Sequence, residues 1–352
     1  MKHQPNITWD QGSAYDLFVS LRVLHQPEDY GLRPSWAAGV RSRLTGPRRE
    51  ILAQSQAFLP IPLAWLQHLP PPKNAAAALS ALADLPPEDR LPALTFGKKD
   101  DQESAAFRSF LLSLEGKQRL SASIESRIKS FQSPIKKASK SGLRACFEAW
   151  RDRRSFGINL LDALEAYVQS FFTEEEPRIH AAQSKALTTA KSLVAEKGIL
   201  SALEELSAGV RMDWALEVNK LILAPSFWGA PFVFFDTLDP DTGVILFGAR
   251  LQGSTLVPGE LVPEDLLAAL KALADPTRLR ILRYLQSIPS TPSDLAKVLR
   301  LRPPTVIHHL HSLRLAGLVR VTVSQEGERR YAARSNGIET TLQNLQAFIQ
   351  GE

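Results

Sequence analysis

The order of helix and strand signals in the last part of the chain constrains its fold more than any other feature. Asp275 followed by Pro276 predicts a helix start, and "TPSDLAKVL" predicts a second helix that begins at its own capping residues. The short link "RLR" leads to a third helix, "TVIHHLHSLRLAG", which ends at Gly317. The run "LVRVTVSQEGERRYAAR" predicts two strands about a turn at Glu326 and Gly327. This is the order of a winged helix-turn-helix.

Apolar residues recur at helical spacing in these three helices and predict their buried faces. The expected core positions are Leu279, Leu282 and Leu285 in the first helix, Leu295, Val298 and Leu299 in the second, and Val306, Leu310 and Leu313 in the third. Three of the seven histidines lie on the third helix. His309 falls near the core side, which predicts a packed, hydrogen-bonded side chain. His308 and His311 lie on the opposite side, which a recognition helix presents to DNA.

Three ordered motifs carry a resemblance to a known family. "LADPTRLRIL", "SDLAKVLRLRPPTVIHHLHSLRLAGLV" and "EGERRYAAR" resemble the winged-helix domain of the arsenic-repressor-like family of bacterial transcription regulators, over about residues 262–335. The resemblance implies a homodimer that binds double-stranded DNA at an operator with two-fold symmetry. The preceding helical region is similar to uncharacterised amino-terminal domains of larger members of that family.

Metal sensing is not expected from these residues. Two exposed histidines at i, i+3 could bind a metal, but a site needs three or four convergent ligands. Metal-sensing members of the family use cysteines on the first helix of the pair, or carboxylate and histidine pairs on the terminal helix. The corresponding stretches here, "SDLAKVL" and "NGIETTLQNLQAFI", contain neither Cys nor His. We expect no cofactor, and any effector should be a molecule other than a metal.

The start of the third helix departs from the family pattern. Arg302, Pro303 and Pro304 stand where relatives have a polar cap and a polar second residue. The prolines remove two backbone donors that a cap would serve, and the side chain of Arg302 could contact a phosphate in their place. Ile307 replaces a common family serine; it could touch a thymine methyl group or pack inside.

Positive charge is concentrated in this module. The whole chain has a net charge of +5, which is only mildly basic, but residues 276–334 contain eleven Lys and Arg against three acids. Such a concentration is what binding to phosphates requires. The residues expected to contact DNA are Arg302, Pro303, Pro304, Thr305, Ile307, His308, His311 and Arg314 on the third helix, and Arg329 and Arg330 after the wing turn.

Two helices that flank the module are expected to form the dimer. They are "EDLLAALKALA" before it and "GIETTLQNLQAFI" after it. The apolar residues proposed for dimerisation are Leu266, Leu270, Ile338, Leu342, Leu345 and Ile349. Packing of the terminal helix on its own domain would produce the same stripe.

The region before residue 255 has a different texture. From Gly12 to about Gly209, Ala- and Leu-rich stretches alternate with Pro, Gly and Ser, which predicts many short to medium helices. The proline-dense stretch "LPIPLAWLQHLPPPKN" should be mostly loop, and a hairpin is expected near 231–250 about "DPDTG". The prediction is a mainly α chain with a helical N-terminal domain over 1–254 and a winged helix-turn-helix over 255–352.

Residues 98–154 are also rich in basic side chains, for which two interpretations compete. The stretch includes Lys136, Lys137, Lys140, Arg144, Arg151, Arg153 and Arg154, interleaved with acids. We favour a solvated helix face over a nucleic-acid patch.

The remaining features bear on compartment and on competing functions. A single cysteine, Cys146, fits a reducing compartment, and neither a signal peptide nor a membrane span is evident, so we expect a cytoplasmic protein. Motifs such as G-x-S-x-G, a phosphate loop or H-E-x-x-H do not occur, and we do not expect an enzyme. The alternative is an enzyme or small-molecule-binding protein with an accessory winged helix. A third possibility is a winged helix used only for protein assembly.

Overall fold

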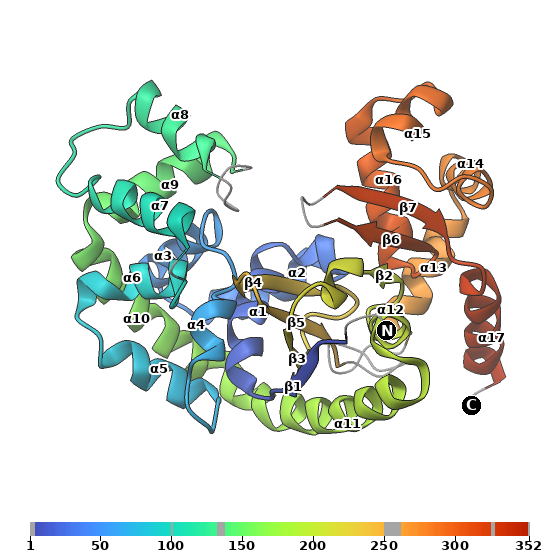
Figure 1. The fold of residues 1–352 in the computed structure, drawn as a ribbon, viewed down its shortest axis with the longest axis horizontal. Helices are drawn as coiled ribbons and strands as arrows, with labels where there is room; N and C mark the ends of the chain where they lie inside the picture. The colour runs from blue at the N-terminus through green and yellow to red at the C-terminus, as the bar shows by residue number, and fades with distance from the viewer. Residues whose placement is uncertain (1–3, 100, 132–137, 250–261, 325–327, 351–352) are drawn as a thin grey trace.

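The computed structural model describes residues 4–99, 101–131, 138–249, 262–324 and 328–350. Figure 1 shows a mainly helical molecule with a small sheet near its centre and a winged helix-turn-helix at one end of its long axis. The expected fold class, mainly α with a C-terminal winged helix-turn-helix, is confirmed. Within the described ranges, every helix is too short or too polar to span a lipid bilayer.

Short helices dominate the N-terminal part, as the sequence predicts. Prolines occupy the first turns of several, and Gly198, with φ of 78°, ends the longest. The proline-dense stretch is loop apart from one short helix, α4. The helices are α1 (Ser13–His25), η1 (Pro27–Tyr30), α2 (Pro34–Ser42), α3 (Gly46–Gln56), α4 (Leu63–Gln67), α5 (Ala75–Ala83), α6 (Pro87–Phe96), α7 (Gln102–Leu112), α8 (Ala122–Ser130), α9 (Lys140–Arg151), α10 (Arg153–Tyr167), η3 (Val168–Phe172), α11 (Thr173–Lys197), α12 (Ile199–Leu206) and η4 (Asp213–Leu216).

A four-stranded sheet lies among these helices, in the order β1-β3-β5-β4. The strands are β1 (Asn6–Trp9), β3 (Lys220–Ser226), β4 (Phe234–Asp239) and β5 (Thr242–Gly248). Strands β4 and β5 form the antiparallel hairpin expected near 231–250. Strands β1 and β3 were not expected as members of a parallel sheet; β1, β3 and β5 run parallel to one another.

The sheet separates two hydrophobic cores, because alternate residues of a strand point to opposite faces. Ile222 and Val244 pack into the large helical core. Leu221 and Ile245 pack into a smaller core that also contains side chains of α11, α12 and the wing. The N-terminal part and the wing therefore share one hydrophobic core.

The C-terminal elements follow the predicted order. They are α13 (Glu264–Leu273), α14 (Pro276–Leu285), α15 (Pro292–Leu299), α16 (Pro303–Leu315), β6 (Val319–Val323), β7 (Arg329–Ala333) and α17 (Gly337–Gln350). The side chains of Asp275 and Thr291 cap α14 and α15, and Gly317 follows α16 with a φ of 65°. The turn expected at Glu326 and Gly327 lies outside the described residues, and its flanking strands β6 and β7 pair antiparallel.

Two core predictions in this module are wrong. Leu279 is 46% exposed and Val298 is 52% exposed. In α14 the buried residues are Ile281, Leu282 and Leu285, and in α15 they are Leu295, Ala296 and Leu299. In both helices these positions are i, i+1 and i+4, so the inward face is turned away from the two residues that were expected there.

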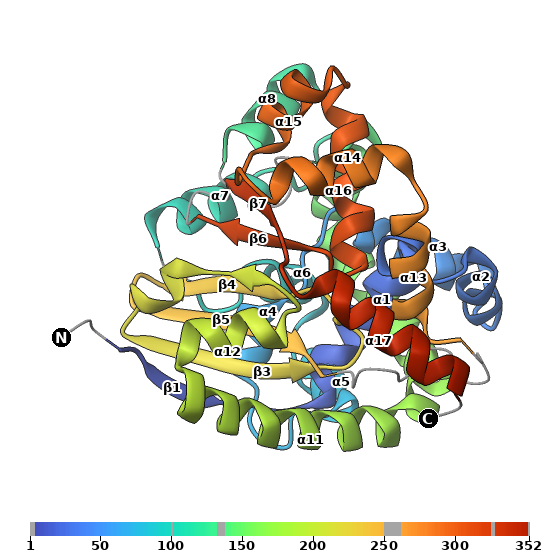
Figure 2. The same cartoon turned by 90° about the vertical axis from the view of Figure 1, so that its right-hand side faces the viewer.

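A strand of the N-terminal part joins the wing. Strand β2 (Val210–Arg211) pairs parallel with β6, which gives a three-stranded sheet in the order β2-β6-β7. Figure 2 shows α11 and the sheet below the wing, with α17 crossing in front. The boundary expected near residue 255 lies within 250–261, outside the described residues.

Candidate nucleic-acid interface

The N-terminal half of α16 presents an exposed surface. Arg302, Pro303, Pro304, Thr305, Ile307 and His308 are all exposed. The prolines stand in the first turn, and no side chain caps the helix. Ile307 is 55% exposed, so it does not pack inside. This half of the helix has the features of a surface that reads base edges, with one apolar group and one imidazole beside each other.

The wing strands carry the next group of expected contacts. Arg329 and Arg330 are exposed on β7, opposite Val323 and Thr322 of β6. The Nε atom of Arg330 lies 3.9 Å from a carboxylate oxygen of Glu328, and both side chains are more than half exposed. An exposed pair of this kind contributes little to stability, so the guanidinium is available to a phosphate.

Arg314 does not belong to this exposed surface. Its side chain is buried, and its guanidinium donates hydrogen bonds to the backbone carbonyls of Ser207, Ala208 and Pro231 at 2.5, 3.1 and 2.9 Å. Burial lowers the pKa of Arg314 to about 10, which leaves it charged at neutral pH. The expected DNA contact is wrong because the N-terminal part takes up the donors of this side chain.

His311 is also turned toward the N-terminal part. Its ring stacks on Phe232, with the ring centroids 5.7 Å apart and the planes inclined by 13°. Its Nε2 atom lies 4.0 Å from Oδ1 of Asp29 in η1. His311, which was predicted to contact DNA, thus makes a contact within the chain, and its side chain is 35% exposed. We call His311, Arg314 and Phe232 the docking contact.

His309 is packed, but not as the sequence predicts. The ring is half-buried, and its Nδ1 atom is buried without a hydrogen-bond partner in the described part of the chain. Burial lowers the pKa of His309, while the nearby carboxylate of Asp275 acts in the opposite direction. The expected packing is present and the expected hydrogen bond is not.

The two helices that flank the module, α13 and α17, differ in how far their apolar side chains are exposed. Leu266 on α13 is 3% exposed and packs within its own chain, and Leu270 is half-buried. Leu266 cannot serve a partner surface while it is covered in this way. On α17, Ile338, Leu342 and Ile349 are 48%, 52% and 73% exposed, and Leu345 is half-buried. Phe348, which was not expected in this set, is 40% exposed. The apolar stripe of α17 is thus largely uncovered.

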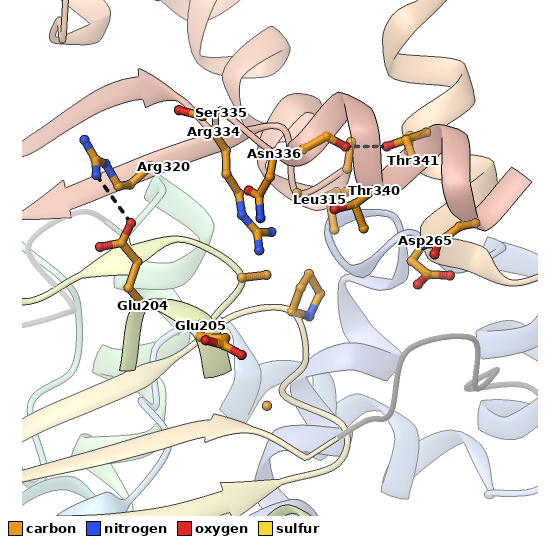
Figure 3. A pocket seen from close by; sticks show the side chains of 18 of the residues that line it. Glu204, Glu205, Asp265, Leu315, Arg320, Arg334, Ser335, Asn336, Thr340 and Thr341 are labelled. Carbon is orange, nitrogen blue, oxygen red and sulfur yellow. Dashed lines mark hydrogen bonds and ion pairs between the residues drawn. The ribbon is translucent and has the colours of Figure 1, made fainter. Parts of the chain in front are cut away.

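A cavity of about 870 Å³ lies where the N-terminal part meets the winged helix. Its walls come from α12, from α13, from the end of α16 and from the start of α17. Ion pairs line one side, with Arg320 at 3.5 Å from Glu204 and Lys197 at 2.7 Å from Glu205. Figure 3 shows Arg334 extending into the cavity. Its guanidinium makes no ion pair with any described residue.

Sequence reasoning missed the docking contact and the cavity. Phe232 lies in an apolar run that predicts a strand and gives no sign of a contact with His311. The partners of Arg314 are backbone carbonyls, which every residue has, so the sequence does not indicate which ones accept its hydrogen bonds. The one available signal was the position of Arg314 next to core residue Leu313 on the same helix. A cationic side chain at the edge of a buried stripe indicates an internal partner as readily as a phosphate.

The comparisons with known proteins agree with this geometry. The model of the family described as "Bacterial regulatory protein, arsR family" matches residues 275–321, which include α14, α15 and α16. The searches of curated proteins and of solved structures found no match. The matched residues are continued by the antiparallel wing strands β6 and β7. The chain therefore contains a winged helix-turn-helix domain of the arsR family of bacterial regulatory proteins, joined to an N-terminal part that the match does not cover.

Proposed function

We propose that this chain is a transcription regulator that binds double-stranded DNA with the N-terminal half of α16 in the major groove and the wing along the backbone. The observation that carries the proposal is the combination of an arsR-family domain with an exposed surface on the N-terminal half of α16 that forms no ion pair with the described residues. Residues Thr305, Ile307 and His308 would contact bases, and Arg302, Arg329 and Arg330 would contact phosphates. A regulator of this kind acts where the chromosome is, which in a bacterium is the cytoplasm.

The test is selection of bound duplexes from a random pool by the full chain, followed by titration at several salt concentrations. Replacing Arg329 and Arg330 with Ala should weaken binding to all sequences alike and lower the slope of log K against log[salt] by about 0.9 for each phosphate that is no longer bound. Arg283→Ala is the control, because Arg283 is exposed on α14 and forms no ion pair with the described residues. Failure of the full chain to retain any duplex at low salt would contradict the proposal.

A homodimer is the second element of the proposal. The uncovered stripe of α17, formed by Ile338, Leu342, Leu345 and Ile349, supports it, because exposed apolar stripes of this width bury against a partner. Leu270 would add to the same surface from α13. Two recognition helices related by two-fold symmetry would then read the two halves of a palindromic operator.

The junction cavity supports a third element, an effector that is a polar small molecule. Side chains of α12, the end of α16 and β6 line it together, so an occupant would touch both the N-terminal part and the recognition helix. Arg334 would bind an anionic group of such a molecule. A simple dicarboxylate or phosphate ester should raise the melting temperature of the wild type and not that of Arg334→Ala; equal shifts in both would contradict the assignment.

For the N-terminal part we propose binding and coupling rather than catalysis. Polar side chains gather at the carboxyl ends of β1 and β3, where α/β proteins often place their sites. Asp16 is buried there and accepts hydrogen bonds from Gln183, from the hydroxyl of Ser226 and from the backbone amides of Phe227 and Trp228. These bonds fasten α1 to α11 and to the end of β3. The buried carboxylate is thereby used in holding elements together.

A further inference from the structure

Positive charge has a second concentration, far from the recognition helix in the sequence. Residues 116–144 contain eight Lys and Arg against one acid, Glu125, in a chain whose total net charge is only +5. The winged-helix residues 276–334 have an excess of eight positive charges. The rest of the molecule is therefore acidic, and two separate parts of it are basic.

The structure divides the basic stretch 98–154 into two groups. Arg151, Arg153 and Arg154 form ion pairs with Glu148, Glu115 and Glu88 at 3.2, 2.5 and 3.3 Å. The pair of Arg151 lies within α9, and Arg153 and Arg154 tie α10 to segments earlier in the chain. The favoured interpretation, a solvated helix face, describes Arg154 and in part Arg151, whereas the side chain of Arg153 is largely covered.

The other group has no such partners. Lys117, Arg119, Lys129, Lys140 and Arg144 are exposed, and none forms an ion pair with a residue that the structure describes. Arg127 is exposed too, and its guanidinium lies 4.8 Å from the ring centroid of Phe131. We call these six residues the α8–α9 surface. Glu125, the acid among them, is half-buried.

The positions of two of these charges destabilise helix α9 in the free protein. Lys140 begins α9, where the helix dipole favours an acid, and Arg144 follows it at i+4 with the same charge. Each arrangement destabilises a helix by a few tenths of a kcal/mol, and a bound polyanion would reverse both effects.

The α8–α9 surface belongs to a lobe that faces the same way as the winged helix. Figure 1 shows α7, α8 and α9 rising at one end of the long axis and α14, α15 and α16 rising at the other, with β6 and β7 extending toward the α8–α9 end. Figure 2 shows α8 at the height of α15, and α11 on the opposite side of the molecule. A long rod of negative charge on α16 and the wing would lie on the side of the molecule from which both lobes rise.

We propose that the α8–α9 surface is a second DNA-binding site, which contacts the sugar–phosphate backbone of the duplex held by α16 and the wing. The proposal rests on the proposed DNA-binding function. Exposed lysines and arginines with one half-buried acid, Glu125, and no exposed aromatic ring among them bind phosphates rather than bases, so this site adds affinity without sequence preference.

The test compares two matched pairs of substitutions in the full chain. Lys129→Gln with Lys140→Gln removes two charges from the α8–α9 surface. Lys185→Gln with Lys191→Gln removes two charges from α11, where both lysines are exposed and unpaired among the described residues. The probe is a long duplex that contains the selected site, titrated from low to moderate salt. The first pair should weaken binding about ten-fold at moderate salt and lower the salt slope by about 0.9 per phosphate released, and the second should change neither.

The outcomes separate the two proposals. If the wild type binds the duplex and both pairs match it in affinity and slope, the second site is absent and the DNA-binding function stands. If the wild type binds no duplex, the function itself fails. If the first pair loses binding to RNA or to anionic vesicles and not to the duplex, the surface serves another polyanion and this assignment is overturned.

A crosslinking experiment places the contact on the DNA. Cys146 is fully buried, so Lys129→Cys offers one accessible thiol for a photoreactive group. Crosslinks to backbone positions outside the bases that α16 selects would support the second site. Crosslinks no more frequent than those from Lys185→Cys would contradict it.

Discussion

Arg314 shows how one side chain can connect two parts of a chain. It donates to three backbone carbonyls of the N-terminal part from within the recognition helix. We predict that Arg314→Ala lowers the free energy of unfolding by about 2–4 kcal/mol, because it removes charge-assisted hydrogen bonds and leaves a cavity. Urea denaturation measures the change, with the exposed Arg283→Ala as control. A change within about 0.5 kcal/mol, as expected for an ordinary surface residue, would show that the docking contact is not formed.

Cys146 is the residue whose chemistry burial changes most plainly. The side chain is fully buried, and burial raises the pKa of its thiol to about 12. The thiol is therefore protonated and covered at pH 8, and the thiolate is the reactive form. We predict no reaction with a thiol reagent in the native protein and complete reaction in denaturant. The exposed Lys129→Cys should react at once, and rapid reaction of the native wild type would contradict this burial.

Residue roles on α16 could be predicted only where they depend on local chemistry. The exposure of His308 follows from helical spacing, and so does the burial of Val306 and Leu310, whereas the sequence left open whether Ile307 is exposed or packed inside. The partners of Arg314 could not be predicted, because they are carbonyl groups more than eighty residues earlier in the chain. A helix period indicates which side chains share a face and says nothing of what covers that face.

At the scale of the element, α16 has two halves with different tasks. The N-terminal half is exposed, and the C-terminal half is held by the docking contact. We predict that Ile307→Ala and His308→Ala change which bases are preferred, with penalties of about 1–3 kcal/mol at one or two positions. Titration against a set of single-base operator variants measures this. A uniform loss over every variant would place both residues on the DNA backbone.

Helix α17 is the element on which the proposed dimer depends. We predict that Leu342→Glu with Ile349→Glu converts the proposed dimer into a monomer. Both side chains are exposed in the single chain, so in the dimer they would be buried against the partner, where a carboxylate would lose its hydration. Sedimentation measures the mass, and titration should show that a palindrome no longer binds better than one half-site. Ile158→Glu is the control, because Ile158 is 47% exposed on α10. A wild type that sediments as a monomer would contradict the dimer.

Elements were predictable from sequence to the extent that their signals are local. Caps at Asp275 and Thr291, the glycine after α16 and the turn signal at Glu326 and Gly327 identified the winged helix and its order. Strand β1 was missed, because four residues cannot show a period and its partner β3 lies more than two hundred residues away. The orientation of the buried faces of α14 and α15 was predicted wrongly. Apolar residues in these helices also occur at i, i+1 and i+4, which is as compatible with a buried helical face as the spacing that was assumed.

At the scale of the whole molecule, the sequence indicated two parts and the structure shows how far they are joined. They share the smaller hydrophobic core, the docking contact and the junction cavity. The ion pairs that separate Arg151, Arg153 and Arg154 from the α8–α9 surface were not predictable, since two of the acids lie more than thirty residues from their partners. Counting charges in the sequence locates a basic region, but the fold is needed to show which of its charges form ion pairs and which do not.

The pairing of β2 with β6 affects whether the winged helix can be separated from the N-terminal part or fused to another one. Strand β2 covers one edge of the wing sheet. A winged helix separated from the N-terminal part would expose that edge, and exposed edges recruit strands from other chains. If this winged helix were fused to a different N-terminal part, that part would have to supply a short strand in place of β2 and hydrogen-bond acceptors for Arg314. The two parts should therefore be moved together in protein engineering, although the family match covers only residues 275–321.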